Sequence, residues 1–203
     1  MKNSIVAVSA GAILSICTFG AVHGAEISKS NGALAASPTV MSGLAGDWSY
    51  RCTFPSPAPG SAPDACVLEQ RLVMQNAQKQ TVPLGGVILA RSVSASRDGA
   101  RVAQPWRLTL MTPLGMSLQA PAQLSFDKGT AFPLPLQTCV SAGCLSGLPL
   151  SDTQLTALRH GKVGHIVLTK LAGGTLTINF ALDGADTGLR TLEGWSKPTA
   201  SSR

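Results

Sequence analysis

The sequence predicts an all-β fold, an antiparallel β-sandwich or barrel-like domain with one short helix. Three observations support this prediction. Apolar and polar residues alternate with a period of two in several short segments. Stretches rich in glycine, proline and serine separate these segments, and one brief stretch alone has a helical period with a cap at its start. Short strands between turn signals are typical of sandwiches and closed antiparallel barrels.

The N-terminal segment has the layout of a secretory signal peptide, which we place at residues 1–24. Lys2 supplies the positive charge, residues 5–22 form an uncharged stretch of apolar and small residues, and cleavage is expected after Gly24, with Ala25 as the alternative. A retained membrane anchor would need a longer apolar run and basic residues after it. The sequence therefore predicts an exported chain.

Export predicts a protein that is periplasmic, associated with the outer membrane, or secreted, and that spans no membrane once the signal is removed. A lipid anchor at Cys17 is the alternative. Ile16 argues against it, because a bulky residue does not usually precede a lipidated cysteine.

The charge pattern argues against nucleic acid as a partner. The formal net charge is +6, but charged residues make up only 13% of the chain and the basic ones are scattered. Aromatic residues make up 4%, too few for the base-stacking platforms of single-strand binders. A weak positive charge keeps such a protein soluble, and it would also ease contact with anionic lipid or polysaccharide.

Four cysteines remain after cleavage, and an even number in an exported chain predicts two disulfides. The sequence alone allows three pairings. We favour Cys52–Cys66 and Cys139–Cys144, because the members of each pair lie close together around turn-forming residues. Zinc is the alternative, but these spacings are poor for a metal and the mature chain has only two histidines. We therefore expect no metal and no cofactor.

We place the folded domain at residues 44–195. Residues 25–43 are small and polar without a period, which predicts a flexible linker after the signal. Residues 196–203 have a similar composition and predict a disordered tail.

Strands are predicted along this domain in order. The first covers residues 48–54 and gathers its large side chains on one face: Trp48, Tyr50, Cys52 and Phe54. A proline-rich loop at residues 55–63 leads to a second strand, whose apolar face holds Leu68, Leu72 and Met74. A buried strand at residues 87–90 follows the glycine pair 85–86, which predicts a bend. Two later strands carry Trp106, Leu108 and Leu110, and then Leu176, Ile178, Phe180 and Leu182.

One short helix is predicted between these strands. Ser151 and Gln154 match a capping box, Leu155 and Leu158 form an apolar stripe, and Gly161 stands where a helix usually ends.

Motifs that carry catalysis are missing from the sequence, so we predict no catalytic residues. Residues 143–147 come closest to the G-x-S-x-G nucleophile motif, but their serine is off position. The C-x-x-C and H-E-x-x-H patterns do not occur. His160 and His165 could form a metal or pH-sensing pair, but a helix C-terminus and a strand face explain them better. Trp48 and Trp106 are expected in the core, and Trp195 at a frayed end.

An ordered series of short motifs resembles one protein family. Residues 46–52 (GDWSYRC) are similar to the Trp-x-x-x-Cys opening of the invasion-associated locus B family. The resemblance continues in order through residues 107–110, 113–115, 126–127, 133–139, 143–144, 155–162 and 175–182, and so covers about 44–192. Residues 183–185 (DGA) depart from it, because the family usually has a Gly-Phe pair there.

The resemblance implies an alphaproteobacterial envelope protein, linked in pathogenic members to host-cell invasion, and it supplies no catalytic residues. We therefore expect a non-catalytic exported protein that acts by binding or structural support, with a protein or another envelope component as partner. The alternative is an accessory, cofactor-free subunit of a periplasmic membrane-bound complex such as a dehydrogenase. A hydrolase with an unfamiliar arrangement is a third hypothesis.

Overall fold

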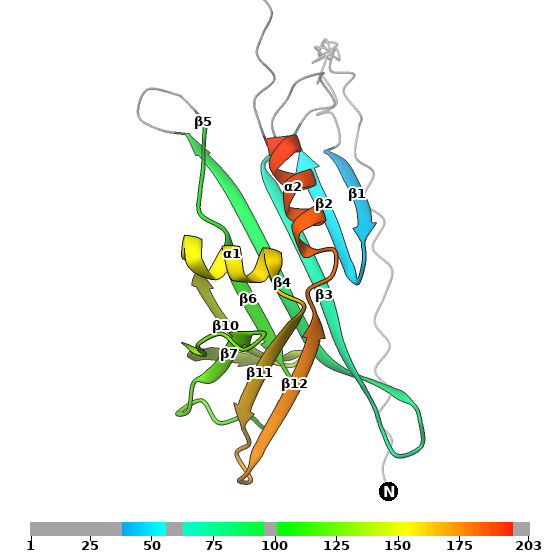
Figure 1. Cartoon of the computed structure of the whole chain (residues 1–203), viewed down its shortest axis with the longest axis vertical. Helices are drawn as coiled ribbons and strands as arrows, with labels where there is room; N and C mark the ends of the chain where they lie inside the picture. The colour runs from blue at the N-terminus through cyan, green and yellow to red at the C-terminus, as the bar shows by residue number, and fades with distance from the viewer. Residues whose placement is uncertain (1–37, 56–62, 96–100, 197–203) are drawn as a thin grey trace, which may run out of the picture. The chain divides into compact units, whose positions relative to one another are not determined.

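Two antiparallel sheets make up most of the computed structural model, which describes residues 38–55, 63–95 and 101–196 (Figure 1). The larger sheet contains, in spatial order, β1 (Thr39–Ala45), β2 (Trp48–Phe54), β3 (Ala65–Gln75), β4 (Thr81–Ala95), β6 (Arg107–Thr112), β10 (Gly143–Pro149) and β9 (Leu136–Val140), with β5 (Arg101–Ala103) paired to β4. The smaller sheet contains β12 (Thr175–Ala181), β11 (Val163–Thr169), β7 (Ala122–Phe126) and β8 (Phe132–Leu134). The predicted all-β antiparallel fold is confirmed as a sandwich of two sheets.

The core forms where the alternating apolar faces of the two sheets meet. The larger sheet contributes fully buried Trp48, Leu68, Leu89 and Leu108, and the smaller sheet contributes Leu124 and Ile166. The Trp48 ring contacts Phe180 of β12 edge-on, with centroids 6.3 Å apart. The period-two pattern therefore predicted the buried positions of Trp48, Leu68 and Leu108 on their strands.

The helix α1 (Asp152–His160) lies where the sequence predicts it. The Ser151 hydroxyl accepts a hydrogen bond from the Gln154 backbone N–H, and the Gln154 side chain accepts one from the Ser151 N–H. Both bonds satisfy donors that the first turn would otherwise leave free. Gly161 caps the other end of the helix.

A second helix, α2 (Ala185–Ser196), was not predicted. It covers the inner face of β2 and β3, beside the smaller sheet (Figure 1). Its Leu189 and Leu192 side chains are fully buried. Gly188 allows the helix to approach the sheet closely, because a Cβ there would meet the Leu68 side chain at 2.5 Å. Two glycines weaken helix propensity in this segment, so the local sequence gives only a faint helical signal.

Two predicted boundaries require correction. The expected linker 25–43 runs into β1, which pairs with β2 along its whole length. Most residues of this edge strand are exposed on both faces. Its sequence therefore lacks the alternation of apolar and polar residues that would predict a strand. The expected tail 196–203 begins at Ser196, which is the last residue of α2. The signal at 1–24, most of the loop 55–63 and residues 197–203 lie outside the described residues.

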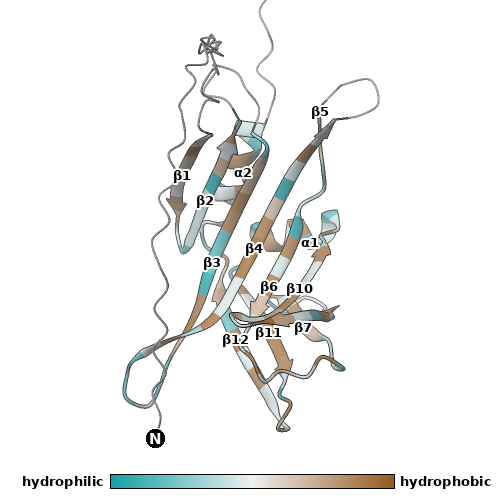
Figure 2. Cartoon of the chain, turned by 180° about the vertical axis from the view of Figure 1, so that it is seen from behind, coloured by the Kyte–Doolittle hydropathy of each residue, from teal (hydrophilic) through white to brown (hydrophobic). Residues whose placement is uncertain are grey.

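Two side chains lie elsewhere than expected. Met74 is 43% exposed, because the register shifts between Leu72 and Val73 and the β3–β4 hairpin then leaves the sheet. This hairpin projects past the rest of the larger sheet (Figure 2). Trp195 packs against the core and is not frayed. The centroids of its ring and the Tyr50 ring lie 5.5 Å apart.

Candidate functional site

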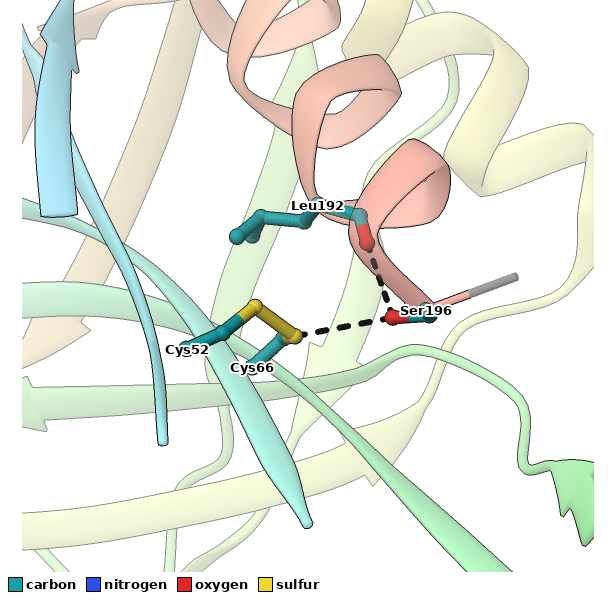
Figure 3. The surroundings of a disulfide bond; sticks show 4 residues. All are labelled: Cys52, Cys66, Leu192 and Ser196. Atoms are coloured by element: carbon teal, nitrogen blue, oxygen red, sulfur yellow. Dashed lines mark hydrogen bonds between the residues drawn. A yellow bond between two sulfur atoms is a disulfide. The ribbon is translucent and has the colours of Figure 1, made fainter. Parts of the chain in front are cut away.

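The four cysteines of the domain form two disulfides, Cys52–Cys66 and Cys139–Cys144, in the pairing that the sequence favoured. Cys52 and Cys66 face each other across β2 and β3, and both are buried. The end of α2 covers them, as Figure 3 shows. The Cys66 sulfur lies 3.5 Å from the Ser196 hydroxyl, which donates to the Leu192 carbonyl at 2.8 Å. This disulfide belongs to the core.

The second disulfide occupies a different environment. Cys139 and Cys144 face each other across the β9–β10 hairpin and close its tight turn. Cys144 is buried, whereas Cys139 and the turn residues 140–142 are exposed. The hydroxyl of the buried Thr112 on β6 donates to the Cys144 carbonyl at 3.3 Å and holds the hairpin to the sheet. The disulfide therefore fixes an exposed tip on a rigid base.

Apolar side chains surround this tip, and we call them the hairpin surface: the exposed Leu114, Leu118, Val140 and Leu171, and the partly buried Met116. Leu171 is 78% exposed and Leu114 is 55% exposed. Backbone hydrogen bonds join the two contributing loops, from Ser117 to Thr169 and from Leu171 to Gly115. A pocket of about 460 Å³ lies between these loops and the disulfide.

A second apolar pocket, of about 500 Å³, lies on the other side of the same turn. Pro113, directly after β6, and Ala142, in the β9–β10 turn, line one side of this pocket. The projecting β3–β4 hairpin lines the opposite side. Val73, Met74 and Val82 are exposed along that hairpin. Single exposed apolar residues are ordinary, whereas contiguous exposed apolar patches are typical of interaction sites.

A cluster of charged residues lies away from these pockets, and its members bind one another. Arg159 of α1 donates to Asp186 at 2.8 Å and to Glu193 at 2.6 Å, and so ties the two helices together. Glu193 also accepts from the Trp106 indole at 3.0 Å, and Arg91 lies 3.7 Å from it. This network fastens α2 to the sheet.

Hydrogen bonding sets the pKa values in this network. Burial alone would raise the pKa of Asp186, but hydrogen bonds from Arg159 and Arg190 outweigh it and hold that pKa below its usual value of 3.8. Burial would lower the pKa of Arg159, yet its bonds to Asp186 and Glu193 raise it. Arg159 and Asp186 thus stabilise each other in their charged forms.

The two histidines are not brought together into a site. His160 ends α1 and is exposed, and His165 lies on β11, where its Nδ1 is 2.8 Å from the side-chain oxygen of Asn179 on β12. Asp127 binds the backbone instead, because N–H groups of Val163 and Lys162 donate to its carboxylate and lower its pKa. Among residues 38–55, 63–95 and 101–196, no three metal-ligating side chains gather. Neither described helix is long and apolar enough to cross a bilayer.

Sequence reasoning identified the disulfides, but it missed the hairpin surface. Its members come from the segment after β6, from the turn of β9–β10 and from the turn of β11–β12. Their approach depends on tertiary pairing, because an isolated bridge between Met116 and Lys170 joins two of the loops. The leucines at 114, 118 and 171, each within three residues of a glycine or proline, were the available signal.

Comparisons with known proteins agree with this architecture. A family model described as invasion associated locus B (IalB) protein matches residues 48–193. The crystal structure of invasion associated protein B from Bartonella henselae is similar over 76% of this chain and 96% of that chain, with a TM-score of 0.54 and 23% sequence identity. At that identity the likeness concerns the fold alone. A search of curated proteins found no match.

Proposed function

Because the chain belongs to the invasion associated locus B family, we propose that it is a non-catalytic, exported envelope protein that binds a protein partner through the hairpin surface. The observation that carries this proposal is the cluster of exposed leucine and valine side chains around the Cys139–Cys144 tip. Disulfides persist in oxidising compartments, which supports export to the periplasm or beyond.

The arrangement of the hairpin surface suits a binding role. Apolar side chains held on a rigid backbone lose little conformational entropy on binding, so more of the interaction energy appears as affinity. The disulfide and the loop-to-loop hydrogen bonds supply this rigidity. Interfaces of this kind place apolar groups at the centre, where they exclude water.

The polar groups support a role without catalysis. Catalysis usually needs a base, nucleophile or metal that is held beside a tuning partner and open to substrate. Arg159, Asp186 and Glu193 instead satisfy one another between the helices and the sheet, away from both apolar pockets.

The family name links its members to invasion, and attachment to a host cell is one form that binding through this surface would take. A stable complex with another envelope protein, as an accessory subunit, is another form. The two differ in the partner that is captured and not in the surface that we assign.

Affinity capture from solubilised envelopes tests the proposal. Leu171→Glu places a charge in the hairpin surface, and Leu44→Glu is its matched control, because the two leucines are 78% and 79% exposed and Leu44 lies on β1. We expect Leu171→Glu to remove a partner that the wild type and Leu44→Glu both retain. Equal capture by both variants, with circular dichroism showing that both fold, would contradict the assignment of the surface.

A further inference from the structure

The pocket between the β3–β4 hairpin and the end of β6 is built by the backbone. The β3–β4 register shifts between Leu72 and Val73, and Gly85 opposite has a φ of +126°. Any Cβ on Gly85 would collide with the Met111 carbonyl oxygen, so the hairpin can bend at this point only with glycine present. β6 ends at Thr112, and the hairpin continues without a neighbour on that side. The resulting gap is the pocket of about 500 Å³.

Apolar groups line most of this pocket. Leu72 and Leu84 are 3% and 9% exposed at its base, and Val73, Pro83, Met111 and Pro113 form its walls. A volume of this size is within the range of small-molecule sites, which are usually apolar with a few polar groups that fix orientation. The lining therefore suits a hydrocarbon chain.

Arg71 is the one charged residue among the described residues that line the pocket. It is exposed on β3, and no carboxylate of the described residues comes within ion-pair distance of it. The acidic residue nearest in sequence, Glu69, is paired with Arg51 at 3.2 Å. Arg71 thus keeps a guanidinium free to bind an anion, and a guanidinium can bind a carboxylate with two parallel hydrogen bonds.

From this juxtaposition we propose that the pocket binds an anionic amphiphile, with its hydrocarbon chain between the β3–β4 hairpin and Met111 and its carboxylate on Arg71. The positive charge of Arg71 at the edge of an apolar cavity selects the negative head group. A free fatty acid has this chemistry, because its hydrocarbon chain ends in a carboxylate. The inference goes beyond the proposed function, because it concerns a different pocket and a small molecule.

Calorimetric titration of the purified mature protein with dodecanoate tests the proposal, at concentrations below those that form micelles. Dodecyltrimethylammonium, with the same chain and a positive head, is the control ligand. We expect dodecanoate to bind more tightly than decanoate by about fourfold for each methylene that becomes buried. We expect Arg71→Gln to weaken dodecanoate about fivefold, as for an exposed ion pair, and not to weaken the cationic ligand.

Two variants separate the pocket from the rest of the surface. Val73→Trp is expected to fill the pocket and abolish binding, whereas Val102→Trp, on the distant β5 strand, should bind like the wild type. If Val73→Trp fails to fold, Ala142→Phe fills the pocket from the opposite side. Equal binding of both head groups, or unchanged binding in a folded pocket-filling variant, would overturn the proposal. Partner capture plays no part in this titration, so its failure leaves the proposed function standing.

Discussion

At the scale of single residues, the fold depends on polar contacts that join distant segments. Glu193 of α2 accepts hydrogen bonds from Arg159 of α1 and from Trp106, which precedes β6. None of these contacts follows from spacing in the sequence, because α2 itself gave a weak signal. The cysteine pairing could be predicted, since each pair is local and an exported chain oxidises its thiols.

Glu193→Ala should lower the free energy of unfolding by about 2 kcal/mol, because it removes one of the two acceptors of the Arg159 guanidinium and the acceptor of the Trp106 N–H. Glu69→Ala is the matched control. Both glutamate side chains are 28% exposed, but Arg51, the partner of Glu69, is 52% exposed against 16% for Arg159. The control should cost less than about 1 kcal/mol. Urea denaturation of both variants makes the comparison, and equal losses would argue against a structural role for the network.

Acid should weaken the fold through Asp186. Its pKa in the folded protein lies below the usual 3.8, so the folded state binds this proton more weakly than the unfolded chain. The stabilisation is complete above pH 3.8 and is lost as the pH falls through the folded-state pKa. Thermal melts at neutral and acidic pH should show a smaller loss for Asp186→Asn than for the wild type. An identical acid dependence in the two proteins would show that this carboxylate does not contribute.

At the scale of the elements, strands with one buried face were predictable and strands without one were not. β2 and β12 alternate strictly and lie where the pattern places them. The edge strand β1 is exposed almost throughout, and α2 depends on packing against Leu68 rather than on its own propensity. An alternating pattern of apolar and polar residues arises where one face of a strand is buried. Elements without such a face therefore cannot be predicted from this pattern.

The two disulfides should differ in their accessibility to reductant. Thiol–disulfide exchange requires a thiolate to reach a sulfur atom. Cys139 is exposed, whereas Cys52 and Cys66 are 0% and 1% exposed beneath α2. Brief treatment of the native protein with a dithiol, followed by alkylation and peptide mapping, should label Cys139 and Cys144 first. Labelling of Cys52 and Cys66 first would mean that α2 does not protect them.

Removal of each disulfide should also rank their contributions to stability. In the chain-entropy model, the loop closed by Cys52–Cys66 contributes about 3 kcal/mol and the shorter loop closed by Cys139–Cys144 about 2 kcal/mol. Paired alanine substitutions at the first disulfide should therefore lower the urea midpoint more than those at the second. The reverse order would show that the β9–β10 hairpin supports more of the fold than its position suggests.

At the scale of the whole domain, the sandwich presents one apolar end where three turns meet, and its polar network lies elsewhere. The sequence was sufficient for the family and the fold class, because both depend on local patterns that recur in order. The hairpin surface was not predictable in the same way. It exists only when the turns after β6, β9 and β11 come together, and no local pattern describes that meeting.

The central claim is that the hairpin surface contacts a protein partner, and site-specific photo-cross-linking in living cells tests it most directly. A photoreactive amino acid would replace Val140 on the hairpin tip or, as a control, Val102 on β5, since these valines are 48% and 46% exposed. We expect a discrete cross-linked protein species from position 140 that is missing at position 102. No cross-link at 140, or the same species from both positions, would contradict it.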